Sequence, residues 1–236
     1  MAGQRPDGGK RTDGDTLVDG VAGRSVGRPC SDEIDLSEGS TASVVLDAVA
    51  TCAARWGMDK TTVDDVAREA GVSRATVYRL FPGGKDSLVE MTTEREAVRL
   101  VSAVGRAVTS EADLETAMTV MLNTAARLLD AEPALTYMRA HEPATLRRLL
   151  SMHHLDTILE MVADALSPGL AGFLDPEDAR EVVIWGARLV VSYYLIPDPA
   201  RDLTDIDEAR RLVRNHLLAG IAPAAAADAL VTTPHT

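Results

Sequence analysis

Aromatic residues are scarce in this sequence of 236 residues, at 3%, although hydrophobic residues of all kinds make up 46%. The core must therefore be aliphatic, which favours closely packed helices over β-sandwiches, where aromatic and β-branched residues dominate. No apolar run approaches the length of about 18 residues that a membrane span needs. The N-terminus also lacks the apolar stretch of a secretory signal. The sequence predicts a cytoplasmic protein with no membrane partner.

Residues that carry catalytic or metal chemistry are few. Of the two cysteines, Cys30 falls in a segment without periodicity and Cys52 in an apolar helical pattern, so we expect neither a disulfide framework nor a metal site. His153 and His154 are adjacent and would face different directions on a helix. The sequence also has no glycine-rich phosphate loop, no nucleophile elbow and no paired metal-ligand spacing. These absences predict a protein that is not an enzyme and needs no cofactor.

The net charge of −12 argues at first sight against a nucleic-acid partner, because phosphate contacts dominate the affinity for DNA. The charge is unevenly distributed, however. Residues 41–90 carry 6 basic and 7 acidic side chains, whereas residues 91–236 carry 13 and 21. A basic surface can therefore form in the first segment if its Lys and Arg residues share one face.

Periodicity divides the chain into four predicted parts. Residues 1–40 lack periodicity and are expected to form a flexible arm, and residues 222–236 a flexible tail. Apolar residues recur at helical spacing through the predicted domains 41–90 and 91–221. The second domain shows no strand alternation, so the fold class expected is all-α. Its helical patterns cover residues 85–108, 113–130, 133–140, 144–166, 176–196 and 205–219.

The stretch from Thr61 to Leu88 carries the strongest functional signal. Two short helices meet at Ala70-Gly71-Val72, which is the spacing of a helix-turn-helix, and glycine suits the sharp turn because it tolerates positive φ. Val77, Leu80 and Phe81 are expected to face inward, over an apolar stripe that ends at Trp56. The remaining side chains of the second helix then point outward, as a helix in the major groove requires.

These outward side chains have the chemistry of a DNA interface. Arg74 can bind guanine or phosphate, Ala75 and the methyl group of Thr76 can contact thymine methyls, and the hydroxyl of Tyr78 can bind phosphate. Ser73 and Thr62 stand at helix starts, where free N–H groups bind phosphate, and so does Lys85. The predicted DNA-binding residues are Thr62, Ser73, Arg74, Ala75, Thr76, Tyr78, Arg79 and Lys85.

The motif T-T-x-x-x-V-A-x-x-A-G-V-S-x-x-T-V-Y-x-x-F-P, followed by K-D-x-L, resembles the DNA-binding region of the TetR family of bacterial transcriptional repressors. The resemblance covers residues 44–88. It implies three DNA-binding helices, a linking fourth helix, and a helical effector domain that forms a homodimer through its last two helices. The turn after Phe81 is one residue longer than is common in the family. Gly27-Arg28-Pro29 resembles the minor-groove arginine of some family arms.

The middle helices contain five of the eight methionines, at positions 118, 121, 138, 152 and 161. They can form an ordinary aliphatic core or an adaptable apolar pocket, and the sequence leaves both open. The predicted pocket residues are Met118, Met121, Leu122, Met138, Met161, Trp185 and Tyr193. The segment 182–196 is apolar nearly all round, so one side of it is expected to meet a dimer partner.

We expect the chain to be a transcriptional regulator, namely a repressor whose double-stranded operator DNA is released when a small apolar effector binds. The segment LVVSYYLIPDPARDL is similar to regulators of lipid metabolism, which suggests an acyl or steroid-like effector. The alternative is a small-molecule binding protein with a vestigial DNA-binding head, which the acidic charge favours.

Overall fold

The computed structural model describes residues 34–108, 113–150 and 152–219, with no side-chain description for 152–154. Arg28, Cys30, the tail 222–236 and most of the predicted arm lie outside the described residues. Helices make up nearly all of the described secondary structure, and no strand is formed within it. The prediction of an all-α fold is confirmed. None of the described helices is long and apolar enough to cross a membrane.

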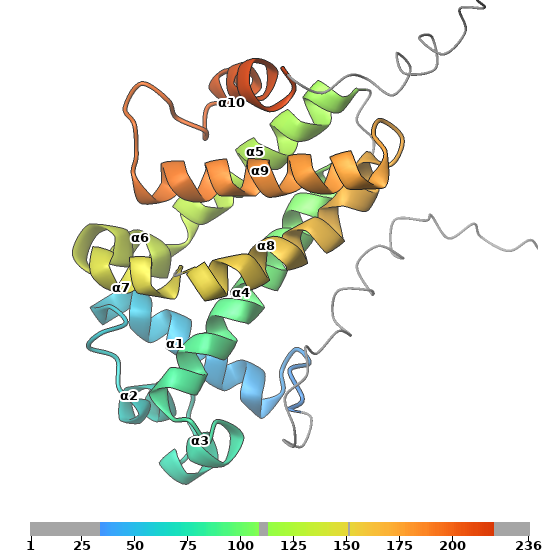
Figure 1. Ribbon diagram of the computed structural model, residues 1–236. Coiled ribbons are helices and arrows are strands. Elements are labelled where there is room, and N and C mark those ends of the chain that lie inside the picture. Colours follow the sequence, from blue (N-terminus) through green and yellow to red (C-terminus); the bar gives the residue numbers. More distant parts are fainter. Residues whose placement is uncertain (1–33, 109–112, 151, 220–236) are drawn as a thin grey trace, which may run out of the picture.

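Three helices form a compact head at the lower end of the molecule in Figure 1, namely α1 (Thr41–Trp56), α2 (Val63–Glu69) and α3 (Arg74–Leu80). A hydroxyl side chain caps the start of each one. Ser40 accepts a hydrogen bond from the N–H of Ser43, Ser73 accepts one from Thr76, and Thr62 forms a capping box with Asp65. Because each capping bond joins residues only three positions apart, the start of a helix can be predicted from the local sequence.

The core of the head is aliphatic with one aromatic ring. Val45, Leu46, Val77 and Phe81 are fully buried, as the inward-facing pattern predicts. The expectation for Trp56 is wrong, since this side chain is 41% exposed. Trp56 is the last residue of α1, and the chain turns away at Gly57, so no neighbouring helix covers its ring.

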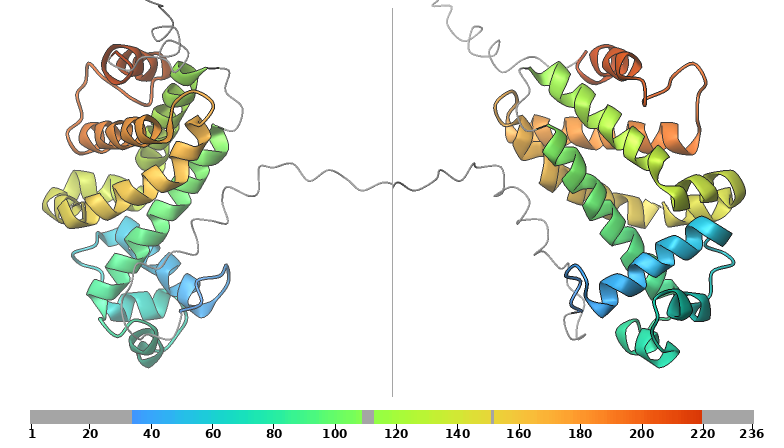
Figure 2. Two further views of the ribbon diagram at one scale, coloured as in Figure 1. Left: turned by 45° about the vertical axis from the view of Figure 1, so that its right-hand side comes forward. Right: turned by 180° about the vertical axis from the view of Figure 1, so that it is seen from behind.

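The long helix α4 (Lys85–Ala107) leads from the head into a helical body. Figure 1 and the two views of Figure 2 show α4 running from the lower end of the molecule up beside α5 and α8. Helix α4 crosses the predicted boundary between the domains 41–90 and 91–221. The division of the chain into these two domains stays a prediction. The body helices are α5 (Leu114–Ala131), α6 (Pro133–His141), α7 (Pro143–Leu149), α8 (Met152–Leu166), α9 (Pro176–Leu195) and α10 (Ile206–Leu212).

Two segments differ from the expected helical pattern. The pattern over 144–166 predicts one helix, but the chain forms α7 and α8 with a break after Leu149. The break lets α7 pack under α6 at the head while α8 packs along α9, which one straight helix could not do. The last predicted helix, 205–219, consists of α10 and one π-helical turn, Val213–Leu217.

Candidate DNA-binding interface and effector cavity

The turn between α2 and α3 fixes the angle of the second helix. Gly71 has a φ of +68°, a backbone conformation that residues with a Cβ rarely adopt. The N–H of Val72 donates to the carbonyl of Ala67 at 2.9 Å, which closes the end of α2. Val77 and Phe81 anchor α3 in the head core, so the opposite side of α3 faces solvent.

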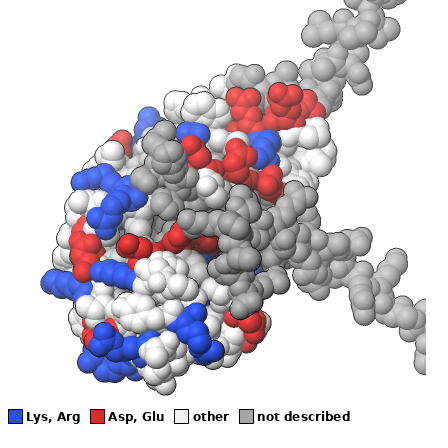
Figure 3. Space-filling model, turned by 60° about the horizontal axis from the view of Figure 1, so that its bottom comes forward, with Lys and Arg blue, Asp and Glu red and all other residues white. Residues whose placement is uncertain are grey.

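The outward side of α3 consists of side chains that can bind DNA. Arg74, Ala75, Tyr78 and Arg79 are exposed, and Thr76 is half-buried. The hydroxyls of Ser73 and Thr76 lie 2.8 Å apart and are hydrogen-bonded to each other. Figure 3 shows basic side chains on both sides of an uncharged area at this end of the molecule. The predicted DNA-binding side chains of α3 therefore lie on its solvent-facing side.

Besides Ser73 and Thr76, three further predicted DNA-binding residues already have partners within the head. The Nε of Arg74 lies 2.7 Å from an Asp64 carboxylate oxygen, and the Nζ of Lys85 donates to the Asp59 carbonyl at 2.9 Å. The hydroxyl of Thr62 donates to Asp65 at 2.6 Å, and this bond holds the pKa of Asp65 below its usual range. The Arg74 pair is exposed and therefore weak, so a phosphate or a base can replace Asp64.

A separate feature of the body is a cavity of about 370 Å³ between the helices, within the size range of small-molecule pockets. Its lining is mainly aliphatic and comes from α1, the loop that follows it, and α4 to α9. Met118, Met121, Leu122 and Met138 of the predicted pocket line it.

The other three predicted pocket residues, Met161, Trp185 and Tyr193, do not line the cavity, and Trp185 is 56% exposed. The all-round apolar pattern of α9 gave no indication of which side faces inward. The side of α9 that lines the cavity carries Val183, Gly186 and Val190. At Gly186 a Cβ would lie 3.0 Å from the end of the Leu122 side chain and 3.3 Å from that of Met118, so a larger residue there would require both side chains to shift.

Sequence reasoning missed Met58, Thr92 and Leu146, and all three line the cavity and are buried. Met58 follows the first helix and Leu146 belongs to α7, far along the chain. The cavity therefore reaches the boundary between body and head.

At that boundary the loop after α1 is bonded to the junction of α6 and α7. The Glu142 carboxylate accepts hydrogen bonds from the N–H of Met58 at 2.8 Å and from that of Asp59 at 3.2 Å. Gly57 has a φ of +86°, and a Cβ there would overlap the Glu142 carboxylate. The hydroxyl of Thr145 donates to the Asp59 carboxylate at 2.8 Å. We call these bonds of Glu142 and Thr145 to residues 58 and 59 the latch.

A helix-turn-helix with an exposed recognition helix defines a DNA-binding regulator. A family model described as bacterial regulatory proteins of the tetR family matches residues 45–91. An uncharacterised HTH-type transcriptional regulator of Mycobacterium bovis is 28% identical over 147 residues, which cover 60% of this chain and 74% of the relative. A Mycobacterium tuberculosis regulator of the same description is 40% identical over 57 residues, which cover 24% of this chain and 30% of the relative.

Solved structures show the same fold at low identity. The TetR-family repressor AlkX from Dietzia, implicated in biodegradation of n-alkanes, has a TM-score of 0.61 at 20% identity, covering 76% of this chain and 96% of its own. The regulator FadR from Bacillus subtilis, in complex with stearoyl-CoA, has a TM-score of 0.50 at 19% identity, covering 76% and 99%. Residues 45–91 thus match the DNA-binding region of the TetR family, and the chain as a whole is similar to HTH-type transcriptional regulators and shares the fold of TetR-family structures.

The individual DNA contacts stay predictions, and Arg74 offers a direct test of them. Arg74→Ala should weaken operator binding by about 1–3 kcal/mol and relax the base preference at one position in each half-site. Asp64→Asn should strengthen binding to all sequences, because it removes the carboxylate that pairs with Arg74. Fluorescence anisotropy with the operator and with unrelated DNA measures both effects. An unchanged operator affinity in Arg74→Ala would remove Arg74 from the interface.

Proposed function

We propose that this regulator is a homodimeric repressor whose head holds operator DNA until a small apolar molecule fills the cavity of the body. A regulator of transcription acts on the bacterial chromosome, so its proposed location is the cytoplasm. The observation that carries the proposal is the double role of Met58. Its side chain lines the cavity, and its backbone N–H donates to Glu142 in the latch.

The lining side chains near the latch explain how an effector can act on it. Met138 lies one turn before Glu142 on α6, and Leu146 lies one turn after it on α7, and both line the cavity. A ligand that separates these side chains from Met58 moves Glu142 away from the loop. Because hydrogen bonds weaken steeply beyond about 3.5 Å, a shift of less than about 1 Å is enough to break the latch.

Breaking the latch frees the loop that leads into α2 and α3. A dimer binds two half-sites only when its recognition helices are about 34–36 Å apart, one turn of DNA. An effector that prefers the open latch lowers operator affinity by its differential binding to the two states. The stearoyl-CoA complex of the Bacillus subtilis FadR supports an effector with an apolar chain, because that regulator shares the fold and its ligand carries a long acyl chain.

Glu142→Gln tests the latch. The variant keeps the size of the side chain but removes the charge that receives the two N–H groups. We expect operator affinity without effector to fall by about 1–3 kcal/mol, the usual contribution of bonds to charged groups. Effector affinity should rise by reciprocity, and the remaining effect of the effector on DNA binding should shrink.

Glu132→Gln is a matched control. Glu132 also lines the cavity and starts α6, but its carboxylate accepts a hydrogen bond from the N–H of Ala134 and not from the head. This variant should keep both operator affinity and effector response. If Glu142→Gln behaves like this control in anisotropy titrations, the latch does not couple the cavity to DNA.

The alternative function, a small-molecule binding protein with a vestigial head, is favoured by the carboxylates that pair with head arginines. Arg55 is paired with Glu69 and Arg74 with Asp64. Exposed pairs of this kind contribute about 0–1 kcal/mol each, so they oppose DNA binding only slightly. Gel shifts with the promoter region of the chain's own operon separate the two functions.

The homodimer is proposed because one recognition helix buries too little surface for tight operator binding. The apolar side chains Trp185 of α9 and Ile206 of α10 are exposed on the helices expected to form the interface. Val183 and Val190, in contrast, are buried in the chain's own core and are not available to a partner.

Trp185→Glu should therefore give folded monomers that lose operator affinity and keep the effector. Trp56→Glu is the matched control, since Trp56 is similarly exposed but lies at the end of α1. Sedimentation velocity at micromolar concentration measures the change. A native protein that is already monomeric, or a Trp185→Glu protein that stays dimeric, would contradict this interface.

A further inference from the structure

One polar atom in the cavity wall lacks a hydrogen-bond partner. Thr92 of α4 lines the cavity and is 6% exposed. Its Oγ1 is one of two buried side-chain polar atoms without a partner among the residues that the structure describes. The other, the Tyr194 hydroxyl, belongs to a residue that does not line the cavity.

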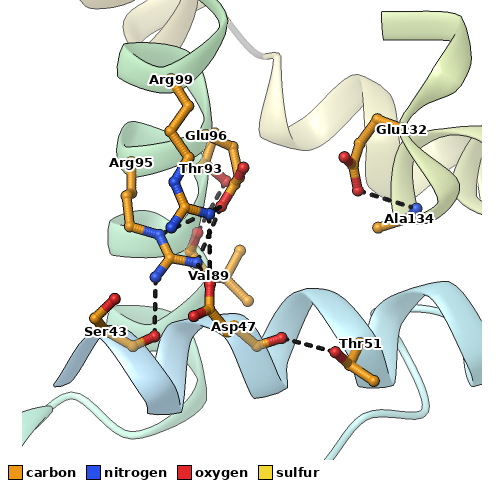
Figure 4. A network of polar contacts seen from close by, with 10 residues as sticks. All are labelled: Ser43, Asp47, Thr51, Val89, Thr93, Arg95, Glu96, Arg99, Glu132 and Ala134. Carbon is orange, nitrogen blue, oxygen red and sulfur yellow. Dashed lines mark hydrogen bonds and ion pairs between the residues drawn. The ribbon is translucent and has the colours of Figure 1, made fainter. Parts of the chain in front are cut away.

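Three other helical threonines bond to the backbone one turn earlier. Thr93 donates to the Val89 carbonyl at 2.8 Å, and Thr51 and Thr119 make the same kind of bond. Figure 4 shows Thr93 with its bond to Val89. A buried hydroxyl without a partner is unfavourable, because its hydrogen bonds to water are lost on burial and not replaced. The Oγ1 of Thr92 is thus an unsatisfied polar atom beside the cavity, with less than 1 Å² of its surface accessible. A ligand can bond to it once rotation about χ1 exchanges the hydroxyl with the methyl group.

The charged residues at the cavity limit what can satisfy it. The described lining contains two carboxylates, Glu96 and Glu132, and one cation, Arg99. The Arg99 guanidinium already bonds to Glu96 at 3.0 Å and to Asp47 at 3.4 Å. In Figure 4 these three side chains lie together on the α1 and α4 side, and Glu132 lies opposite them. An anionic ligand would add a negative charge without an available partner.

We propose that the effector is a neutral, mainly apolar molecule with one hydroxyl or carbonyl group, which hydrogen-bonds to Thr92. This inference rests on the proposed function and names the effector's chemical class. Free carboxylates are disfavoured by the charges at the cavity, and coenzyme A thioesters are disfavoured more strongly by their phosphates. Thr92 is the residue that distinguishes a polar-tipped ligand from a plain hydrocarbon.

The position of Thr92 also connects the ligand to the head. Arg95, one turn further along α4, donates to the Ser43 carbonyl at 2.9 Å and to the Asp47 carboxylate at 2.8 Å. Its side chain is only 9% exposed, so this attachment of α4 to α1 is largely shielded from water. A ligand held by Thr92 is thus bonded to the helix that Arg95 attaches to the head.

The experiment compares 1-decanol, decanoate and n-decane by isothermal titration calorimetry with the full chain. The native protein should bind 1-decanol more tightly than either of the others. Thr92→Val, which replaces the hydroxyl by a methyl group, should weaken 1-decanol binding about three- to tenfold and leave n-decane unchanged or tighter. It should also keep or raise the melting temperature, because it removes an unsatisfied buried group.

Thr93→Val is the matched control, because Thr93 lines the same cavity but its hydroxyl is already bonded. It should leave the preference for 1-decanol intact, and Thr92→Ser should restore it. Tighter binding of decanoate, an equal effect of Thr92→Val on all three probes, or no binding of 1-decanol would overturn the proposal. Operator release by n-decane or decanoate in the same protein would still support the proposed function.

Discussion

The bonding of a carboxylate to two backbone N–H groups connects the two halves of this regulator. Glu142, between α6 and α7, receives the N–H groups of Met58 and Asp59 in the loop after α1. The close approach is possible because residue 57 is glycine, with a positive φ and no Cβ. Charge-assisted bonds of this kind are directional and sensitive to distance, so small displacements of α6 change the position of the loop.

The long helix α4 forms a second connection between the halves. Its first turns pack on the head, where Lys85 bonds to the Asp59 carbonyl and Arg95 bonds to α1. Its middle and later turns line the cavity. The loop at Asp59 is thus held by Lys85 from α4 and by Glu142 and Thr145 from the body. A ligand in the cavity can act on it from both sides.

The sequence predicted the features that depend on neighbouring residues. Thr62 and Ser73 identified the starts of α2 and α3, because a capping bond spans only three residues. The inward faces of these helices followed from their apolar spacing. The family followed from the same stretch, since its motif combines these caps with the glycine turn.

Features that depend on packing between distant segments could not be predicted in this way. The side of α9 that faces the cavity depends on its packing against other helices, and Trp185, a predicted pocket residue, does not line the cavity. In the sequence, Glu142-Pro143 indicated only a helix break. The bond of the Glu142 carboxylate to the N–H of Met58 could not be predicted, because the two residues are 84 positions apart. Thr92 resembles any other helical threonine until its missing partner is seen.

The most direct test of the account is hydrogen exchange at the N–H groups of Met58 and Asp59, measured by NMR with and without 1-decanol. Both groups are hydrogen-bonded to Glu142 in the empty protein and should exchange slowly. The account predicts faster exchange at both when the ligand is bound, with little change at Gly57, whose N–H bonds to Ala53 within α1. Unchanged or slower exchange in a ligand-bound protein that has released its DNA would contradict it.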